Sequence, residues 1–310
     1  MAEIHDLIIQ HGREAARDLV PANQRHLVDA AADILTSESN ALGYSYSGFA
    51  LTALPHRKLP DDEVWERRGH RVTLSIEPGR LRVNGVTKKF GVPYGARARM
   101  ILIYLQTQAI ITGSREVSIG RSMRDWLEKM GIAVGGETAK AFRDQSRRIS
   151  AAHLKFYWDG ENGSEGFEKG DIIKRGLTFG EILGDDKETR QQRLWEDTVV
   201  IDEEFFRMLR EHPVPLLDDA IKALKEKSLA LDTYIWMAYR LHSLSKPTPV
   251  SWAAVMDQFG GGFKKLSHFK PHFIETLQHV ISVYPEARIA VADEGLVLHP
   301  SRPPVAKLIA

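Results

Sequence analysis

The sequence contains one order of expected elements twice, and this repeat constrains the fold more than any other feature. Each copy has a central apolar helix, a short helix, a glycine turn, a helix with basic residues and a hairpin. The glycine turn is Gly135-Gly136 in the first copy and Gly260-Gly261-Gly262 in the second. Two helices joined by a glycine-containing turn form a helix-turn-helix, and the hairpin after them predicts a winged helix. No sequence identity connects the copies, so the repeat is architectural.

Hydrophobic spacing defines the first copy. Apolar residues at 100–110 surround nearly the whole helix, which is typical of a helix buried at the centre of a domain. Ser118 is expected to cap the short helix, and the basic helix is expected at about 137–152. Residues 153–158 and a returning strand near 172–173 then predict the hairpin.

The second copy begins with a long apolar helix at 229–244, and Ser251 is expected to cap the short helix after it. The next helix contains Pro271, which breaks a helix unless it lies in the first turn. We therefore expect the second basic helix to begin near Lys270. A hairpin at 287–299 completes the copy.

The remaining segments precede the first copy. Residues 4–36 have helical spacing, and residues 36–48 are predicted to form a loop. An extended arm is expected at 49–62, and its basic residues 56–58 either reach phosphate or belong to a polar loop. Asn84-Gly85 is the strongest short signal of a hairpin.

The expected fold class is α+β, with two tandem winged-helix domains and a helical N-terminal extension. The predicted boundaries are 1–44 for the N-terminal helices, 45–180 for the first winged-helix domain, 181–197 for a linker and 198–305 for the second winged-helix domain.

The sequence also excludes several kinds of chemistry. The chain has no cysteine, which excludes disulfides, thiolate metal sites and a cysteine nucleophile. It has no Gly-x-x-x-x-Gly-Lys-Ser/Thr or Gly-x-Ser-x-Gly motif, and adjacent acidic pairs such as Asp61-Asp62 point apart. We therefore expect a protein that is not an enzyme and that needs no cofactor.

Hydropathy and net charge limit the expected location and the expected partners of the protein. No apolar run approaches the ~20 residues that cross a bilayer, and no basic segment leads into an apolar stretch at the N-terminus. We expect a soluble, cytoplasmic protein without a membrane partner. Because 42 Lys and Arg residues balance 41 Asp and Glu residues, a nucleic-acid binder of this composition must gather its cations on one face.

The first candidate contact surface lies on the predicted helix 137–152. Its residues fall at i, i+3, i+7 and i+8 on one helical face: Lys140, Arg143, Arg147 and Arg148. The major groove of B-DNA admits one helix, and Arg or Lys can bind guanine edges or phosphates there. The alternative is a solvated face that Glu137 and Asp144 partly neutralise. The helix-turn-helix context favours DNA contact.

The second candidate contact surface lies near the start of the last long helix: Lys264, Lys265, Ser267, His268, Lys270 and His272. A helix N-terminus favours phosphate through its dipole, although each histidine could equally be an ordinary surface residue. His268 and His272 are spaced like a metal pair, but no acidic residue lies next to either, so no metal site is expected. Their protonation is expected to strengthen DNA binding at lower pH.

Five segments together resemble the plasmid-encoded RepA family of replication initiators. In order they are 52–61 (TALPHRKLPD), 90–95 (FGVPYG), 229–241 (LALDTYIWMAYRL), 250–260 and 283–287 (VYPEA). The resemblance covers about residues 45–305. The family's recognition helix corresponds to residues 264–278, from which Pro271 and His272 depart.

The resemblance implies a protein that binds repeated sequences (iterons) in double-stranded DNA at a plasmid origin. Such a protein helps to open the origin and recruits host replication proteins, namely the initiator and the helicase. Related initiators with two winged helices bind iterons as monomers and repress their own promoters as dimers. A homodimer is therefore an expected partner, with autoregulation and control of plasmid copy number as the expected consequence.

Two alternatives remain open from the sequence. The first is a winged-helix transcriptional repressor without replication activity. The second is a protein-interaction module that uses its tandem domains as docking surfaces. Salt-dependent DNA binding would separate the second alternative from the others.

Overall fold

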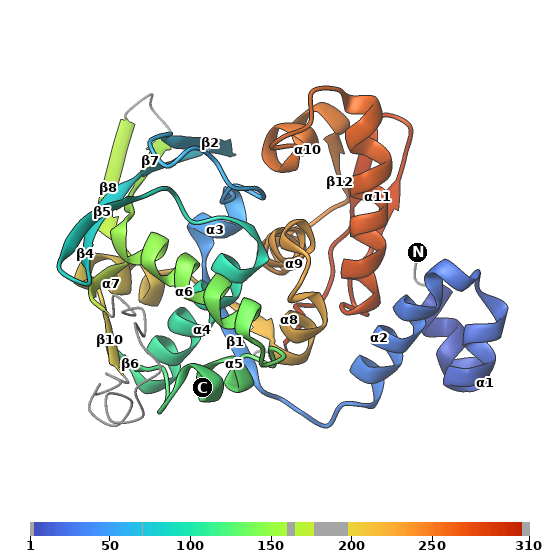
Figure 1. The fold of residues 1–310 in the computed structure, drawn as a ribbon. Coiled ribbons are helices and arrows are strands. Elements are labelled where there is room, and N and C mark those ends of the chain that lie inside the picture. Colours follow the sequence, from blue (N-terminus) through green and yellow to red (C-terminus); the bar gives the residue numbers. More distant parts are fainter. Residues whose placement is uncertain (1–2, 70, 160–164, 177–197, 306–310) are drawn as a thin grey trace.

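The computed structural model describes residues 3–69, 71–159, 165–176 and 198–305. Helices and small antiparallel sheets alternate along the chain, so the predicted α+β class is confirmed (Figure 1). The predicted linker at 181–197 lies outside the described residues. The domain boundaries stay predictions.

The first half of the chain is built around a buried apolar helix, α4, as its sequence predicts. Its elements are α4 (Gly95–Thr112), β6 (Glu116–Ser118), α5 (Met123–Lys129), α6 (Gly136–Ala151) and, after two strands of another sheet, β9 (Ile173–Arg175) and β10 (Thr198–Ile201). The three strands form an antiparallel sheet in the order β6-β10-β9. Strand β10 follows the predicted linker in sequence, yet it pairs only with strands of the first half among the described residues.

The second half repeats this arrangement around the helix α9. Its elements are α9 (Ser228–Arg240), η2 (Leu241–Ser243), β12 (Thr248–Ser251), α10 (Trp252–Phe259), α11 (Leu266–Ser282), β13 (Ile289–Val291) and β14 (Gly295–Leu298). Their sheet has the order β12-β14-β13. Apart from two additional strands between α6 and β9 in the first half, the two halves therefore share one order of helices and strands, and in both the last strand lies in the middle of the three-stranded sheet.

A second sheet and a separate hairpin distinguish the first half. Strands β2 (Trp65–Gly69), β3 (Val72–Glu77), β7 (His153–Asp159) and β8 (Glu165–Asp171) form a four-stranded sheet in that order. Strands β4 (Gly79–Val83) and β5 (Val86–Phe90) pair only with each other among the described residues. Asn84 and Gly85 between them both have positive φ, as the predicted Asn-Gly turn requires.

Three local expectations are wrong. Ser118 ends β6, and the cap of α5 is instead Ser122, whose hydroxyl accepts from the backbone N–H of Asp125 at 3.1 Å. The strand that returns beside β7 is β8, whereas Ile173 belongs to the other sheet. Helix α11 already begins at Leu266, so Pro271 lies inside it rather than at its start. Proline there removes one backbone donor, and the packed helix tolerates that loss.

The predicted loop at 36–48 contains a strand that only the tertiary structure reveals. Strand β1 (Leu42–Tyr46) pairs over five residues with β11 (Pro213–Leu217) from the other half of the chain. Prolines at 213 and 215 lack an N–H, which a two-stranded sheet tolerates because both of its strands are edges. The short helices α3 (Ser47–Leu51), α7 (Glu203–Glu211) and α8 (Asp218–Leu224) flank this pair in sequence.

A buried ion pair joins α4 to α9. The Nε and Nη2 of Arg99 donate to the two carboxylate oxygens of Asp232, each at 2.6 Å, and both side chains are almost fully buried. The remaining guanidinium N–H groups donate to the carbonyl oxygens of Leu54, Pro55 and Gly95. Because every N–H of Arg99 has an acceptor, this pair links the predicted arm to the cores of both halves.

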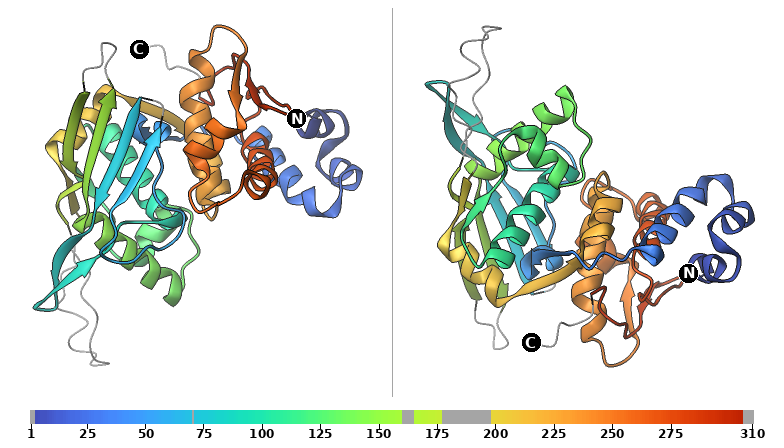
Figure 2. Two further views of the ribbon diagram at one scale, coloured as in Figure 1. Left: turned by 90° about the horizontal axis from the view of Figure 1, so that it is seen from above. Right: turned by 90° about the horizontal axis from the view of Figure 1, so that it is seen from below.

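The N-terminal extension is helical, as predicted, and packs on the second half. Helix α1 (Glu3–Leu19), the turn η1 (Ala22–Gln24) and α2 (Arg25–Thr36) lie beside α11 in both views of Figure 2. His5 contacts the carbonyl oxygen of Ser282 at 3.1 Å, and the Nε2 atoms of His26 and His279 lie 2.9 Å apart.

Candidate nucleic-acid interface

Helix α6 places part of the first basic group on its solvent side. Gly135 is extended and Gly136 begins the helix, after which Phe142 and Ile149 are buried. On the other side Lys140 is exposed and Arg143 is half-buried. Arg147 is also half-buried, and it makes an interaction inside the protein. The apolar residues therefore hold α6 on the core while Lys140 and Arg143 remain accessible.

The prediction for Arg148 needs correction, because this side chain is only 3% exposed. Its Nε donates to Asp144 at 2.8 Å, its Nη1 lies 3.0 Å from Asp61, and its guanidinium stacks over the ring of Tyr94 at 5.3 Å. An α-helix turns by ~100° per residue, so Arg148 points about 140° away from Arg143. Arg148 thus links the predicted arm to α6 through its ion pair with Asp61, and its guanidinium is not exposed for contact with DNA.

The second basic group gathers around the first turns of α11. Lys265 is the N-cap residue of the helix, and Lys264, Ser267 and His268 are exposed beside it. Phe269 and Phe273 are fully buried on the opposite side of the helix. The N-terminus of α11 therefore presents two lysines, one hydroxyl and one imidazole to solvent.

Lys270 and His272 make contacts within the second half. The Nζ of Lys270 donates to the carbonyl oxygen of Asp293 at 3.2 Å and lies 5.1 Å from the ring centroid of Trp252. The exposed ring of His272 packs 5.4 Å from that of Phe263. Lys270 is thus tied to the turn between β13 and β14, whereas His272 remains open to solvent.

The two basic groups lie in different halves of the molecule. In Figures 1 and 2 helix α9 lies between α6 and α11. The structure therefore does not merge the predicted residues into one site, but gives each half its own basic helix.

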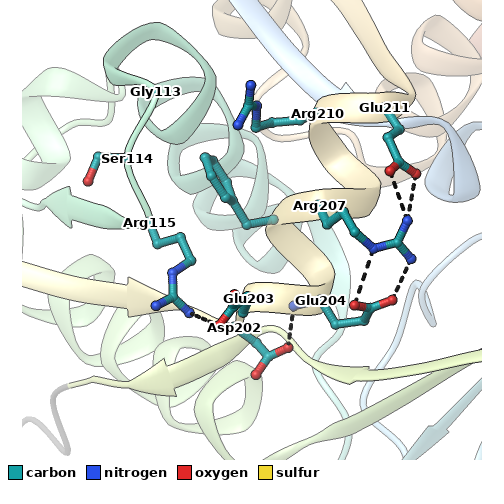
Figure 3. A pocket seen from close by; sticks show the side chains of 10 residues that line it. Gly113, Ser114, Arg115, Asp202, Glu203, Glu204, Arg207, Arg210 and Glu211 are labelled. Atoms are coloured by element: carbon teal, nitrogen blue, oxygen red, sulfur yellow. Dashed lines mark hydrogen bonds and ion pairs between the residues drawn. The ribbon is translucent and has the colours of Figure 1, made fainter.

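One surface hollow is not lined by any of the predicted residues. It has a volume of about 1030 Å³ and lies between the end of α4 and α7. Figure 3 shows Arg207 held between Glu204 and Glu211, and Arg115 directed toward Glu203 at 3.4 Å. Its lining has four carboxylates and three guanidinium groups, so it does not favour a polyanion.

The described residues also bear on metal binding and on membrane insertion. No cluster of three or more His, Asp or Glu side chains in that part of the chain could hold a metal ion. No described helix is both long and apolar enough to span a membrane.

One basic element was missed as a candidate contact. The sequence predicts the hairpin of β4 and β5, but the two candidate contact surfaces predicted from it do not include the cations of this hairpin. The signal was available, because Arg80 and Arg82 alternate with apolar residues at the period of a strand.

Comparison with solved structures supports the fold. Domains 2 and 3 of RctB, as a selenomethionine derivative, align with a TM-score of 0.53 and 14% identity, covering 83% of this chain and 99% of that chain. A second structure of RctB domains 2 and 3 gives a TM-score of 0.48 and 16% identity, covering 81% and 94%. No curated protein shows significant similarity in sequence.

Comparison with protein families confirms the resemblance noted in the sequence. The model of the family described as plasmid encoded RepA protein matches residues 92–255, which is more than half of the chain. The matched region extends from the start of α4, through α6, to the middle of α10. The chain therefore belongs to the plasmid encoded RepA protein family of replication initiators.

Proposed function

We propose that this initiator binds repeated sequences (iterons) in duplex DNA at a plasmid origin and promotes opening of the origin. The observation that carries the proposal is the accessible basic side of α6, where Lys140 and Arg143 project from the second helix of a helix-turn-helix. Family membership supplies the context of replication.

The order of elements supports a winged-helix interpretation of both halves. In each half two helices joined by a glycine turn are followed in sequence by strands of a three-stranded sheet. In helix-turn-helix proteins the second helix lies in the major groove while the first crosses the backbone. By this interpretation α6 and α11 are the two recognition helices, and the duplex contacts both halves.

The contact residues on the two helices then have different tasks. On α6, Lys140 and Arg143 bind phosphates or guanine edges, and Arg147 contributes beside them. On α11 the exposed cations and hydroxyl donors bind phosphate near the helix N-terminus, where backbone N–H groups also favour an anion. The α11 residues proposed as contacts are Lys264, Lys265, Ser267, His268, Lys270 and His272.

Arg143→Ala tests the role of α6. We expect weaker binding to duplex DNA that carries the repeats of the origin, by about 1–3 kcal/mol if Arg143 reads a base. If Arg143 binds a phosphate, the plot of log affinity against log salt concentration flattens by about 0.9 units instead. Fluorescence anisotropy at several salt concentrations measures both quantities.

The matched control is Arg25→Ala on α2, which also removes one surface arginine but far from α6. It should leave the affinity and the salt dependence unchanged. An Arg143→Ala protein that binds like the wild type would remove α6 from the interface.

In this proposal the chain acts in the cytoplasm by binding alone and catalyses no reaction. It recruits the host initiator and helicase to the opened origin, and a homodimer represses its own promoter. A plasmid that carries only this gene and its upstream repeats should replicate in a suitable host. Failure to replicate, with DNA binding intact, would favour a transcriptional repressor.

A further inference from the structure

The β4–β5 hairpin is a two-stranded ribbon whose two faces differ in character. Cross-strand register places Arg80 opposite Lys89, and Arg82 opposite Thr87. Because opposite residues and residues i and i+2 share a face, these four side chains form one surface, here called the ribbon face. The other face, here called the apolar face, holds the apolar residues of the hairpin together with Lys88, which lies opposite Leu81.

The apolar face is directed toward the body of the molecule. Val83 is buried and Leu81 is half-buried. Gly79 approaches the end of α6 so closely that a Cβ atom there would lie 1.7 Å from the carbonyl oxygen of Ala151. These contacts fix the base of the ribbon next to the basic helix α6.

The ribbon face is exposed, and its only charged residues are the cations Arg80, Arg82 and Lys89. All four of its residues are exposed, and the segment 79–90 contains no acidic residue. Within the described part of the chain none of the ion pairs includes Arg80, Arg82 or Lys89; the Nε of Arg82 donates to the carbonyl oxygen of Gly85 at 3.2 Å. Like charges directly opposite each other destabilise a strand pair, so Arg80 and Lys89 carry a cost that a bound anion would offset.

We propose that the ribbon face binds the phosphate backbone of duplex DNA, next to the segment contacted by α6. The inference rests on the proposed function, because it adds a second contact in the same half of the molecule. Arginine and lysine without carboxylate partners match a continuous line of phosphates. The ribbon face has no aromatic side chain on which an unpaired base could stack, which favours a duplex over a single strand.

The test removes the three cations while keeping long polar side chains, in the variant Arg80→Gln/Arg82→Gln/Lys89→Gln. Each lost phosphate contact should flatten the salt dependence by about 0.9 units, so we expect a change of roughly two to three units. Affinity for repeat DNA and for unrelated duplex should fall by the same factor, because phosphates carry no sequence information.

Two controls accompany this variant. Arg80→Lys/Arg82→Lys keeps the charge and should retain the salt dependence of the wild type. Lys246→Gln/Arg288→Gln removes two exposed cations of the second half and should leave DNA binding unchanged. Circular dichroism and thermal unfolding establish that all three proteins are folded, which is expected because every substituted side chain is exposed.

The outcomes separate this inference from the proposed function. A wild type that binds duplex DNA, together with a folded triple variant of unchanged salt dependence, overturns the ribbon contact alone. Loss of binding to single-stranded DNA only, or loss of the repeat-specific component only, also overturns it. A wild type without salt-dependent duplex binding overturns the proposed function and the ribbon contact together.

Discussion

The charge of His56 is determined by its burial in the folded protein. The sequence places it in an arm that either reaches phosphate or forms a polar loop, but its ring packs within the protein. Its Nδ1 contacts the hydroxyl of Ser228 at 3.0 Å, and the Nη2 of Arg99 lies 3.4 Å away. Burial, followed by the nearby positive charges of Arg99 and Arg67, lowers the pKa of His56 to about 2. The ring is therefore neutral in the folded protein and adds no positive charge for DNA.

This shift predicts a loss of stability in acid. The unfolded chain takes up a proton at His56 below a pKa of about 6.5, whereas the folded chain does not until about pH 2. The stabilisation is therefore complete above pH 6.5 and falls by about 1.4 kcal/mol per pH unit below it. Urea unfolding at pH 7.5, 5.5 and 4.5 measures this slope.

The variant His56→Asn separates the pH dependence of stability that His56 causes from the pH dependence that the carboxylates cause. Its unfolding free energy should fall less steeply between pH 6 and pH 4 than that of the wild type. Parallel curves for the two proteins would show that His56 is protonated equally in both states.

At the scale of elements, spacing along the chain predicts helices well and long-range strands poorly. The Asn-Gly turn, the apolar helix α4 and the Ser251 cap of α10, which accepts from Ala254 N–H at 3.2 Å, all follow from local residues. Strand β1 does not, because its pairing with β11 spans most of the chain. The burial of Arg148 cannot be predicted from local residues for a related reason, because its carboxylate partner Asp61 lies in an arm that is distant in sequence.

Docking of α2 on α11 depends on a pair of histidines. His279 is buried beside His26, and its Nδ1 contacts the carbonyl oxygen of Glu275 at 2.8 Å. Burial, together with the positive charge of Lys227, lowers the pKa of His279. The docked state therefore favours a neutral ring, and its stability should decrease as the pH falls below the pKa of an unburied histidine.

Hydrogen exchange of the α2 amides, corrected for intrinsic rates, tests this prediction. We expect lower protection at pH 5.5 than at pH 7.5 in the wild type. The variant His279→Asn, which cannot be protonated, should lose this pH dependence. Equal protection of wild-type α2 at both pH values would contradict the prediction.

At the scale of the whole molecule, the two halves pack against each other and are not connected by the chain alone. One hydrophobic cluster includes buried residues of both halves, and the β1–β11 pair and the Arg99–Asp232 ion pair cross between them. A buried ion pair contributes little net stability, but removing one partner leaves a charge without compensation. The joint between the halves is therefore sensitive to single substitutions.

Arg99→Met is expected to lower the free energy of unfolding by about 3–5 kcal/mol, because the buried Asp232 would lose its guanidinium partner. Denaturant unfolding followed by fluorescence and by circular dichroism measures the loss. The double variant Arg99→Met/Asp232→Leu should recover a large part of it. If the single variant were as stable as the wild type, the carboxylate would have to be solvated or protonated in the folded state.

The sequence by itself determined the fold class, the repeated order of helices, and the family, because these depend on local periodicity, turn residues and short motifs. Only the tertiary structure decided which cations face solvent. Lys140 and Arg148 belong to the same basic stretch, yet the first is exposed and the second is enclosed by Asp61 and Asp144. Charge neutralisation depends on partners that are distant in sequence, so no local pattern can reveal it.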